Sequence, residues 1–412
     1  MRNEGRSSLS ETASRPTVII AGAGIGGLTA ALALAAKQFR VIILEGAKRL
    51  EEVGAGLQIS PNASRILNSL GVSAHLAGQA VSIDAIRVIS GRTGDEIVRI
   101  PFTDAASRFG APYWIVHRAD LQAALLARVA EVPNIELRLG CAYESCTANN
   151  EGVTVVQDDG QDRVSLQALA LIGADGVRSA VRAQFFPTMR QPQFSGFVAW
   201  RGTCDAQRLS PELRQPDVQL WLAPGAHIVT YPVNGGRRVN IVIISRSTWN
   251  KPGWNEDGYS GEIATRLSPL SLSEGTRTLT GAISAWTKWA MFTMPDCGWA
   301  HGRIALLGDA SHAMLPFAAQ GAGMAIEDAA VLAQCLADGG AHVEEALHRY
   351  GELRHARVER VRHTARQNGR IYHFGAPVDW ARDLSMKLLG GRTPLSRQQW
   401  IYDWKPAALE TA

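Results

Sequence analysis

The sequence predicts an α/β protein with a doubly wound parallel-sheet lobe, an inserted and mostly antiparallel β-sheet lobe, and C-terminal helices. Residues 17–45 have the pattern strand, glycine turn, helix, strand, which is the unit of a doubly wound sheet. Residues 194–245 alternate short strands with Pro/Gly turns, and residues 348–370 are a long Arg-rich helical stretch. Parallel strands need crossover helices whereas antiparallel strands need only turns, so the patterns indicate separate lobes.

The composition is that of an ordinary globular protein. The chain has 412 residues, 46% hydrophobic and 19% charged, so it is long enough to bury a large core. Its net charge is only +4 without a run of Lys or Arg, which gives a nucleic-acid partner no support. The five cysteines are scattered and lack zinc spacing, which predicts reduced thiols, a cytoplasmic location and no metal site. Residues 1–16 are expected to be a disordered lead.

The first element carries a nucleotide-binding pattern. A β-branched strand at residues 18–20 runs into the glycines of residues 22–27. In this pattern Gly22 permits a tight turn, Gly24 lets the backbone approach a pyrophosphate, and Gly27 allows close packing of helix on strand. Phosphates are expected at the helix N-terminus, and Glu45, at the end of the second strand, is placed to bind a ribose.

Two simpler interpretations of this stretch compete with nucleotide binding. Residues 18–36 are almost continuously apolar, with Thr29 the one clearly polar residue, and so resemble a signal peptide or a membrane span. The clustering of glycines, a flank of mixed charge and the strand that follows argue against both. A simple NAD dehydrogenase would explain this first pattern alone.

The next elements continue the first lobe. A second glycine cluster at residues 52–62 precedes a helix at 63–70, and two strands surround a turn at 91–95. A helix is expected from about residue 117 to 129 with Asp120 as its N-cap. Arg118, just before it, suits either a phosphate or a surface acid. Strands and hairpins fill residues 135–172.

Two further glycine elements follow. The strand at residues 168–172 leads into GADGVRSAVR, whose acid and arginines suit a phosphate-rich ligand. After the antiparallel region and a looser connection, a buried strand at 303–309 precedes a helix that begins near Gly321 and reaches about residue 336. The aromatic tail at 400–404 is expected to pack on the body or on a partner chain.

Together these three elements resemble one family. GAGIGG at residues 22–27, GADGVRSAVR at 173–182 and GDASHAMLPFAAQGAGMAIEDA at 308–329 resemble the fingerprints of single-component FAD-dependent aromatic hydroxylases. VGAGLQISPNA, GFVAWRG and HIVTYPVNGG are most similar to the salicylate hydroxylase, 3-hydroxybenzoate 6-hydroxylase and 6-hydroxynicotinate 3-monooxygenase subgroup. The resemblance covers about residues 17–370. It is highly specific for FAD and less so for the substrate.

The resemblance implies a division of the chain. A Rossmann-like FAD-binding domain would comprise residues 17–82, 105–185 and 296–340. The inserted substrate domain would comprise residues 83–104 and 186–295. Residues 341–412 would form a C-terminal helical segment.

The resemblance also implies which residues bind the cofactor. Glu45 would hold the adenosine ribose, Arg118 the pyrophosphate side of FAD, and Asp309 the ribityl chain. Asp175 and Arg178 would brace the region where FAD meets the incoming NADH or NADPH. The remaining positions form the glycine turn, the second glycine cluster and the border of the isoalloxazine ring: Gly22, Gly24, Ile25, Gly26, Gly27, Gln58, Pro316, Gly321, Ala322, Gly323 and Met324.

The implied reaction is the hydroxylation of an aromatic ring by dioxygen. A phenolate reacts far better than a phenol, so a base is needed near the substrate hydroxyl. On an alternating strand, His227 and Tyr231 point the same way, so His227 is the predicted base and Tyr231 a hydrogen-bond partner of the substrate. If that face meets solvent, His227 is an ordinary surface residue. His312 and Gln58 are rival positions.

The expected substrate is a small phenolic or hydroxylated heteroaromatic acid, with loss of CO₂ if the carboxylate lies on the attacked carbon. Arg201 is either the partner of that carboxylate or a structural arginine. The alternatives are a flavin-dependent epoxidase or reductase of a non-phenolic substrate, and a non-catalytic nucleotide-sensing module. The choice of NADH or NADPH, and of monomer or homodimer, stays open. No membrane partner is expected.

Overall fold

The computed structural model describes residues 15–50, 56–251, 253–270 and 272–406. The predicted α/β class is confirmed by a six-stranded sheet in the order β19-β20-β12-β1-β2-β8. All its pairings are parallel except that of β19 with β20. Its strands are β1 (Thr17–Ala21), β2 (Arg40–Glu45), β8 (Ile135–Leu139), β12 (Ala170–Gly173), β19 (Ala300–His301) and β20 (Ile304–Leu306).

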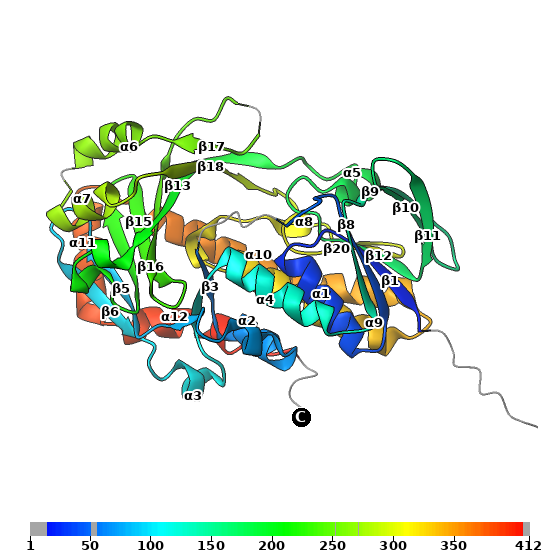
Figure 1. Cartoon of the computed structure of the whole chain (residues 1–412). Helices are drawn as coiled ribbons and strands as arrows, with labels where there is room; N and C mark the ends of the chain where they lie inside the picture. Colours follow the sequence, from blue (N-terminus) through cyan, green and yellow to red (C-terminus); the bar gives the residue numbers. More distant parts are fainter. Residues whose placement is uncertain (1–14, 51–55, 252, 271, 407–412) are drawn as a thin grey trace, which may run out of the picture.

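Two layers cover the parallel sheet, as Figure 1 shows. Val18 and Ile20 of β1 pack among helices α1 (Ile25–Ala36), α4 (Arg118–Ala130) and α9 (Gly321–Gly339). Ile19, from the opposite side of the same strand, packs with residues of the small sheet β9–β11 and helix α5 (Ala180–Phe185). Successive strand residues point to opposite faces, so a wholly apolar strand is buried on both sides. The small sheet comprises β9 (Ala142–Ala148), β10 (Val153–Asp158) and β11 (Arg163–Ala168).

A second, eight-stranded sheet lies beside the first in the order β17-β18-β13-β16-β15-β14-β5-β6. Its pairings are antiparallel except that of β14 with β5. Segments 85–101 and 193–293, far apart in sequence, therefore share one sheet. Its strands are β5 (Ala85–Ser90), β6 (Glu96–Pro101), β13 (Gln193–Asp205), β14 (Asp217–Ala223), β15 (Ala226–Val233), β16 (Arg238–Arg246), β17 (Asn255–Gly258) and β18 (Trp286–Thr293).

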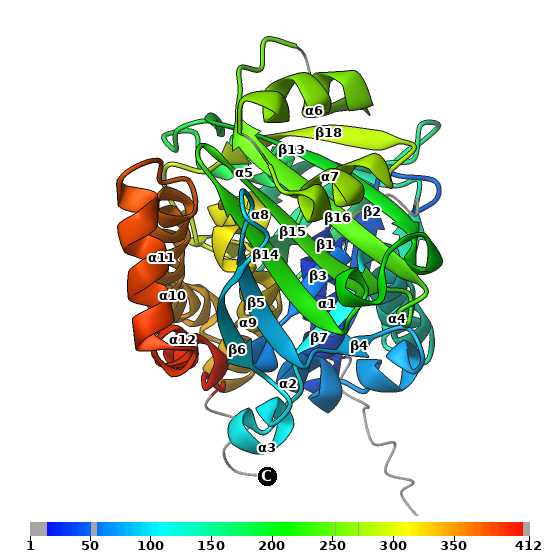
Figure 2. The same ribbon diagram turned by 90° about the vertical axis from the view of Figure 1, so that its left-hand side faces the viewer.

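The C-terminal helices are α10 (Val343–Tyr372), α11 (Val378–Leu389) and α12 (Arg392–Tyr402). Helices α11 and α12 contact β6 at one edge of the eight-stranded sheet (Figure 2), whereas α10 packs on α9. The aromatic tail packs on the body. Trp404 lies against the guanidinium groups of Arg354 and Arg357, at 5.4 and 4.8 Å from ring centroid to Cζ.

The remaining elements are short. A three-stranded sheet in the order β3-β7-β4 joins the two lobes through a contact of β7 with β15. Its strands are β3 (Gly56–Ile59), β4 (Val81–Ser82) and β7 (Trp114–His117). The other helices are α2 (Pro61–Ser69), α3 (Ala105–Phe109), α6 (Ser260–Leu267), α7 (Glu274–Gly281) and α8 (Asp309–His312), with 3-10 turns η1 (Val72–Leu76), η2 (Ala206–Arg208), η3 (Pro211–Leu213), η4 (Ser268–Leu270) and η5 (Pro316–Ala318).

The predicted N-cap of the helix near residue 117 was wrong, and the apolar stretch at residues 18–36 is not a single helix. Helix α4 begins at Arg118 and its N-cap is His117, so Asp120 is not the cap. Asp120 lies in the first turn instead, where its Oδ2 accepts a hydrogen bond from Asn234. Residues 18–36 divide into β1 and α1, and none of the described helices is long and apolar enough to cross a bilayer. Of the predicted disordered lead, residues 1–14 lie outside the described residues.

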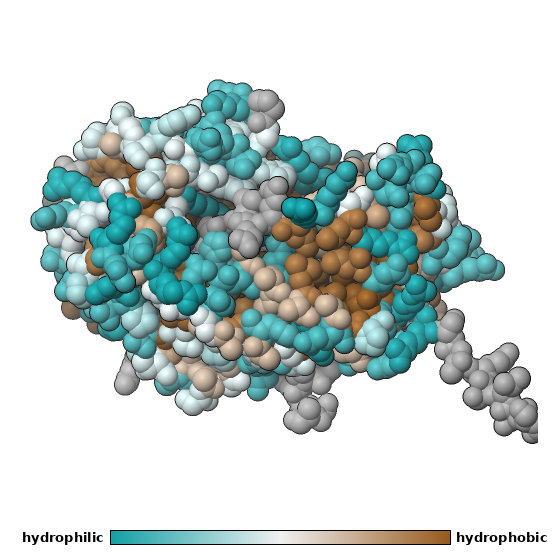
Figure 3. Space-filling view, in the orientation of Figure 1, coloured by the Kyte–Doolittle hydropathy of each residue, from teal (hydrophilic) through white to brown (hydrophobic). Residues whose placement is uncertain are grey.

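One face of the molecule shows where apolar residues gather. In Figure 3 most of that face is hydrophilic, whereas a hydrophobic area lies over the position of α1. Helix α1 is apolar on all sides and nearly all its residues are buried. Such a helix belongs between layers, and α1 indeed contacts both α9 and α4.

Candidate active site

A cavity of about 1060 Å³ connects the two sheets and the C-terminal helices. Its size is at the upper limit of ordinary ligand sites, which are about 300–1,000 Å³. The glycine turn of the first lobe, the inner face of the eight-stranded sheet and helices α9 to α12 all contribute to its wall. Of the residues predicted from sequence, those that line it are Gly24, Ile25, Gly26, Gln58, Arg118, Arg201, His227, Tyr231, Asp309, Pro316, Gly321 and Ala322.

The first glycine turn has the geometry of a phosphate cradle. Gly22 has φ +105°, and a Cβ there would lie 2.5 Å from the carbonyl oxygen of Ala174. A Cβ on Gly27 would collide with the Gly22 carbonyl at 2.0 Å, so this glycine permits close packing. A Cβ on Gly24, by contrast, would meet nothing within 4 Å. The backbone at Gly24 is therefore open to the cavity, at the N-terminus of the 12-residue helix α1.

The charged residues around this turn divide into bonded and unbonded groups. Glu45 accepts hydrogen bonds from the amides of Ala23 and Ala47, at 2.8 and 2.9 Å, and so shapes the turn itself. Arg118 and Asp309 both line the cavity with exposed side chains. Neither has an ion-pair or hydrogen-bond partner for its side chain within the described parts of the chain. Both are therefore available to a ligand.

Asp175 and Arg178 of the second glycine element have local partners in the structure. Asp175 Oδ2 accepts from the amides of Ala180 and Val181, at 2.7 and 3.2 Å, at the start of α5. Burial raises the pKa of Asp175, and its Oδ1 is buried without a partner among the described residues. Arg178 is exposed and its guanidinium lies over the ring of Trp254, 4.7 Å from the centroid. Neither residue lines the cavity, so their predicted contact with the two cofactors stays a prediction.

The third element presents a helix N-terminus to the cavity. Pro316, Gly321 and Ala322 line it, and nothing lies within 4 Å of a Cβ placed on Gly321. The first bond within α9 runs from the Met324 amide to the Gln320 carbonyl, so the preceding amides are free of intrahelical partners. Gly323 and Met324 are buried behind this end. The positive end of α9 would favour negative charge in the cavity.

A buried ionic network anchors the same helix from behind. Asp328 accepts from His312 at 2.6 Å and from Arg354 at 2.7 Å, and all three side chains are at most 1% exposed. Burial opposes ionisation of Asp328, but His312 and Arg354 outweigh it and lower its pKa. His312 is thus committed to Asp328 and does not line the cavity, which places the rival base in a supporting position.

The predicted alternation of β15 is observed. His227, Val229 and Tyr231 line the cavity, whereas Ile228 packs in the cluster on the opposite face of the sheet. His227 and Tyr231 lie about 13 Å apart along the strand, at about 3.3 Å per residue. They therefore meet different parts of the cavity.

His227 is held by a residue that sequence reasoning missed. Its Nδ1 lies 2.7 Å from Nε2 of His373, the residue that follows α10. Burial lowers the pKa of His227 well below its ordinary value of 6.5, and the adjacent His373 lowers it further. Burial, with Arg246 and Arg382, lowers the pKa of His373 to about 4. Both imidazoles are neutral near pH 7, and a neutral imidazole is able to accept a proton.

Tyr231 and Gln58 take part in local hydrogen bonds. The Tyr231 hydroxyl donates to the Gly56 carbonyl at 2.6 Å, and burial raises its pKa. A Cβ on Gly56 would lie 2.2 Å from the Tyr231 ring, which accounts for a glycine there. Gln58 Oε1 accepts from Tyr113 at 2.9 Å. The expected contacts of these residues with substrate and cofactor stay predictions. Residues 51–55 of the second glycine cluster lie outside the described residues.

Arg201 supplies a largely buried cation without a counterion. It lines the cavity, its Nε is buried without a partner, and no acidic side chain of the described residues forms an ion pair with it. Its guanidinium lies 5.7 Å from the centroid of the Trp289 ring. Burial lowers its pKa, yet a guanidinium stays charged at physiological pH. An unpaired charge away from water is costly, so this site is suited to an anionic ligand.

The register of the sheet relates Arg201 to His227. Arg201 pairs with Val242, which pairs with Val229, and His227 lies two residues from Val229 on the same face. Two strand spacings and one side-chain repeat separate the backbone positions by about 12 Å. Both side chains extend inward from this face and border the same cavity.

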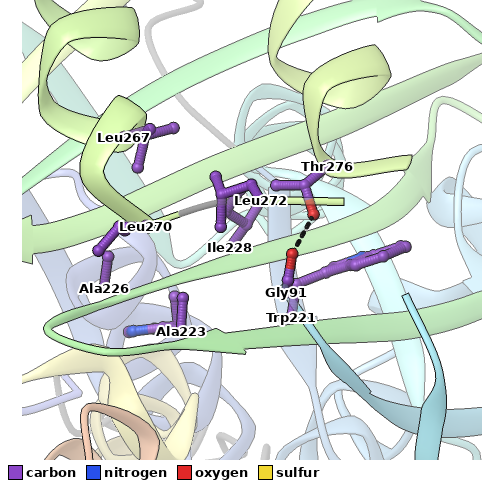
Figure 4. A pocket seen from close by; sticks show the side chains of 10 residues that line it. Gly91, Trp221, Ala223, Ala226, Ile228, Leu267, Leu270, Leu272 and Thr276 are labelled. Carbon is purple, nitrogen blue, oxygen red and sulfur yellow. Dashed lines mark hydrogen bonds between the residues drawn. The ribbon is translucent and has the colours of Figure 1, made fainter. Parts of the chain in front are cut away.

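The opposite face of the same strands is filled. A void of about 10 Å³, about the space of one water, lies there between β14, β15 and the α6–α7 segment. Figure 4 shows Ile228, Leu267, Leu270 and Leu272 around it, with the hydroxyl of Thr276 bonded to the Gly91 carbonyl.

Comparison with known proteins shows the family to which the chain belongs. The chain matches the model of the FAD binding domain family over residues 15–365. It is 33% identical to 3-hydroxybenzoate 6-hydroxylase of Polaromonas naphthalenivorans (strain CJ2), over 94% of this chain and 96% of the relative. It is 32% identical to salicylate hydroxylase of Pseudomonas putida, over 93% of this chain and 91% of the relative.

A solved structure agrees in fold. A salicylate hydroxylase substrate complex superposes with a TM-score of 0.80 at 26% identity, covering 96% of this chain and 97% of that one. Both the family model and the relatives extend across the two lobes. The chain therefore belongs to the FAD binding domain family, and it is a flavoprotein monooxygenase of the aromatic-hydroxylase group that its three glycine motifs indicated.

Proposed function

We propose that this protein uses FAD, NADH or NADPH, and dioxygen to hydroxylate a small phenolic or hydroxylated heteroaromatic acid. The observation that carries the proposal is the pairing, on one cavity face, of a neutral imidazole and an unpaired guanidinium. His227 suits a phenol and Arg201 suits a carboxylate. The relatives named hydroxybenzoate and salicylate hydroxylases act on rings that carry both groups.

The residues present fit FAD. The open backbone at Gly24, the unbonded side chains of Arg118 and Asp309, and the free amides at the start of α9 suit a pyrophosphate, a polyol chain and an electron-rich ring edge. When bound, FAD supplies the redox and oxygen-transfer chemistry. The chain's own contribution is to bind, orient and ionise the aromatic substrate and to exclude water.

His227 would ionise the substrate. Its Nε2 borders the cavity without a hydrogen-bond partner in the described chain, because Nδ1 is the atom bonded to His373. A neutral Nε2 beside a phenol takes the proton from oxygen and leaves a phenolate, which raises electron density at the ortho and para carbons. General-base catalysis of this kind contributes about 10²–10⁴-fold to the rate.

Arg201 would orient the ring by its carboxylate. A guanidinium and a carboxylate form paired, charge-assisted hydrogen bonds, which set both position and rotation of the ring. The hydroxyl is then directed toward His227 across the inner face of the sheet. If the carboxylate lies on the attacked carbon, the electron pair of the carbon–carboxyl bond returns to the ring and CO₂ leaves.

The first test is NADH and NADPH oxidation by the purified yellow protein with a panel of hydroxybenzoates, salicylates and hydroxynicotinates. The expected result is strong stimulation by at least one acid and a product heavier by one oxygen, or one in which hydroxyl replaces carboxyl. Stimulation by non-phenolic alkenes alone would contradict the role of His227 as a base and would favour an epoxidase or reductase. A colourless protein unable to take up FAD would overturn the whole proposal.

A matched variant tests Arg201. Arg201→Met is expected to raise KM for the preferred acid by about 10-fold or more, the value of a lost charged hydrogen bond. KM for the same phenol without its carboxyl group should change by less than about 2-fold. An equal loss for both compounds, or loss of bound flavin, would assign Arg201 to the cofactor instead.

A further inference from the structure

Resting on the proposed role of His227, we propose that His373 forms the second half of a proton relay. In this relay His227 takes the proton of the substrate hydroxyl and His373, bonded to its far side, passes it outward. His373 does not touch the substrate, so it is a positioning residue that acts through His227.

The geometry is that of two imidazoles sharing one hydrogen bond. The distance from His227 Nδ1 to His373 Nε2 is 2.7 Å, and the ring centroids lie 4.9 Å apart. The two residues are separated by 146 positions in the chain and meet because the end of α10 lies against His227 of β15. Phe197 and Phe317 lie beside His373, at centroid distances of 5.3 and 5.8 Å, so the shared bond lies among aromatic rings.

Only one arrangement of protons lets His227 act as a base. Its cavity-facing Nε2 must carry the lone pair, so its Nδ1 carries the hydrogen and donates to Nε2 of His373. His373 then holds its own hydrogen on Nδ1. That nitrogen is buried and has no partner among the described residues. Buried polar groups of this kind are ordinarily bonded to water, and the proposed relay requires such an acceptor at its outer end.

The transfer balances with one proton and no electrons. The O–H bond of the substrate breaks, and its proton bonds to Nε2 of His227. The hydrogen on Nδ1 of His227 moves to Nε2 of His373, and the hydrogen on Nδ1 of His373 moves to water. Both rings end neutral in their other tautomers. The reverse transfer restores them when the product oxygen is protonated.

The surroundings prevent the proton from resting on the relay. His373 faces His227 from β15, Arg246 from β16, Tyr372 from its own helix and Arg382 from α11. The two arginines repel an imidazolium, and no described carboxylate forms an ion pair with either imidazole. Arg382 itself is paired with Asp383 at 2.8 Å. His373 therefore transmits a proton and does not store it.

The competing interpretation is that His373 only packs against the aromatic cluster and holds the His227 ring in place. The two interpretations differ in the effect of a side chain that keeps the hydrogen bond to His227 but cannot pass a proton, because it would satisfy a packing role and interrupt a relay. A loss caused by an interrupted relay should concern only a substrate whose hydroxyl still carries its proton. The experiment therefore compares a phenolic substrate with its nitro-substituted analogue, whose hydroxyl is ionised at the assay pH.

The variant is His373→Gln, because an amide keeps a hydrogen bond to His227 Nδ1 but does not exchange protons in this way. His348→Gln is the matched control, since His348 lies on the exposed side of α10 with a side chain 75% exposed. We expect kcat of H373Q with the phenol to fall by about 10–100-fold below the pKa of its hydroxyl, a part of the range for acid–base catalysis. With the ionised analogue, kcat should lie within about 2-fold of the unaltered protein. Flavin content and Tm show that the variant is folded.

The possible outcomes separate this inference from the proposed function. An H373Q profile equal to the unaltered protein at every pH, or an equal loss with the ionised analogue, overturns the relay while leaving His227 as the base. If H227N shows no loss with the phenol, the proposed function of His227 itself fails. Should Gln disturb the aromatic cluster, H373A with added imidazole replaces it. Recovery of the rate supports the relay, and no recovery in a folded, yellow protein contradicts it.

Discussion

The two faces of the eight-stranded sheet are built from the same strands but have opposite properties. The inner face borders the cavity of about 1060 Å³ and presents His227, Tyr231 and Arg201. The outer face packs Trp200, Trp221 and Ile228 under α6 and α7 and leaves a void of about 10 Å³. Because successive strand residues point to opposite faces, one residue can line the cavity while its neighbour in sequence packs in the hydrophobic core. Mutations of adjacent residues should therefore have separable effects.

The largest expected effect comes from the adjacent pair His227 and Ile228. H227N should lower kcat with a phenolic substrate by about 10²–10⁴-fold with little change in Tm. I228A should instead lower the free energy of unfolding by about 2–5 kcal/mol, because it enlarges the void beside a side chain only 3% exposed. Turnover and thermal melts of both variants give the answer. If each variant loses both turnover and stability, the two faces do not serve separate functions.

The next effect concerns acid stability, to which the two buried histidines of the inner face should contribute. The pKa values of His227 and His373 are lowered in the folded protein, so between about pH 6.5 and 4 the unfolded chain binds protons that the folded one does not. This contribution to stability is complete above pH 6.5 and is lost as the pH falls. Thermal melts from pH 4 to 7 should show a shallower decline for H373Q than for the unaltered protein. Parallel curves would contradict the assigned pKa shifts.

Substitution of Tyr231 tests whether a residue of the inner face also contributes to the stability of the fold. Its hydroxyl gives its hydrogen to the Gly56 carbonyl, so Y231F should lower the free energy of unfolding by about 0.5–1.5 kcal/mol. The loss of kcat should remain below about 10-fold, because a hydroxyl that donates to the backbone is left only to accept from the substrate. Chemical denaturation and turnover measure the two effects. A collapse of kcat at unchanged stability would show that the proton serves the substrate instead.

The smallest effect lies at the outer layer. Ser273 caps α7 by accepting a hydrogen bond from the Thr276 amide, and α7 closes the outer face beside Trp221. S273A should cost about 1 kcal/mol of stability, the usual value of an N-cap. KM and kcat should not change. An altered KM would mean that the outer layer communicates with the cavity.

Much of the site could be predicted from sequence because its signals are local. The glycines at 22 and 27 have the turn and close-packing geometry expected of them, and the backbone at Gly24 is open, because these features depend on residues nearby. The alternation of β15 likewise follows from the strand period. The N-cap of α4 was wrong by three residues, because Asp120 found a partner in Asn234 across the interface with β15.

The contributions of the C-terminal helices could not be predicted. Residues of α10, α11 and α12 complete the cavity, yet their sequence shows only an Arg-rich helix and an aromatic tail. Arg354 is only 1% exposed, and Glu327 and Asp328 of α9 neutralise it. The hydrophobic periodicity of one segment does not indicate which charged residues of a distant segment will lie beside it in the fold.

The sequence by itself determined the strands, the glycine cradle and the face of β15 that carries His227, since each depends on short-range sterics and on side-chain period. The tertiary structure alone decided that His227 meets His373 and that Arg201 has no counterion among the described residues. Both facts depend on burial and on which distant segments touch. Burial and contact are also what change a pKa, so the chemistry of the site is a property of the folded chain.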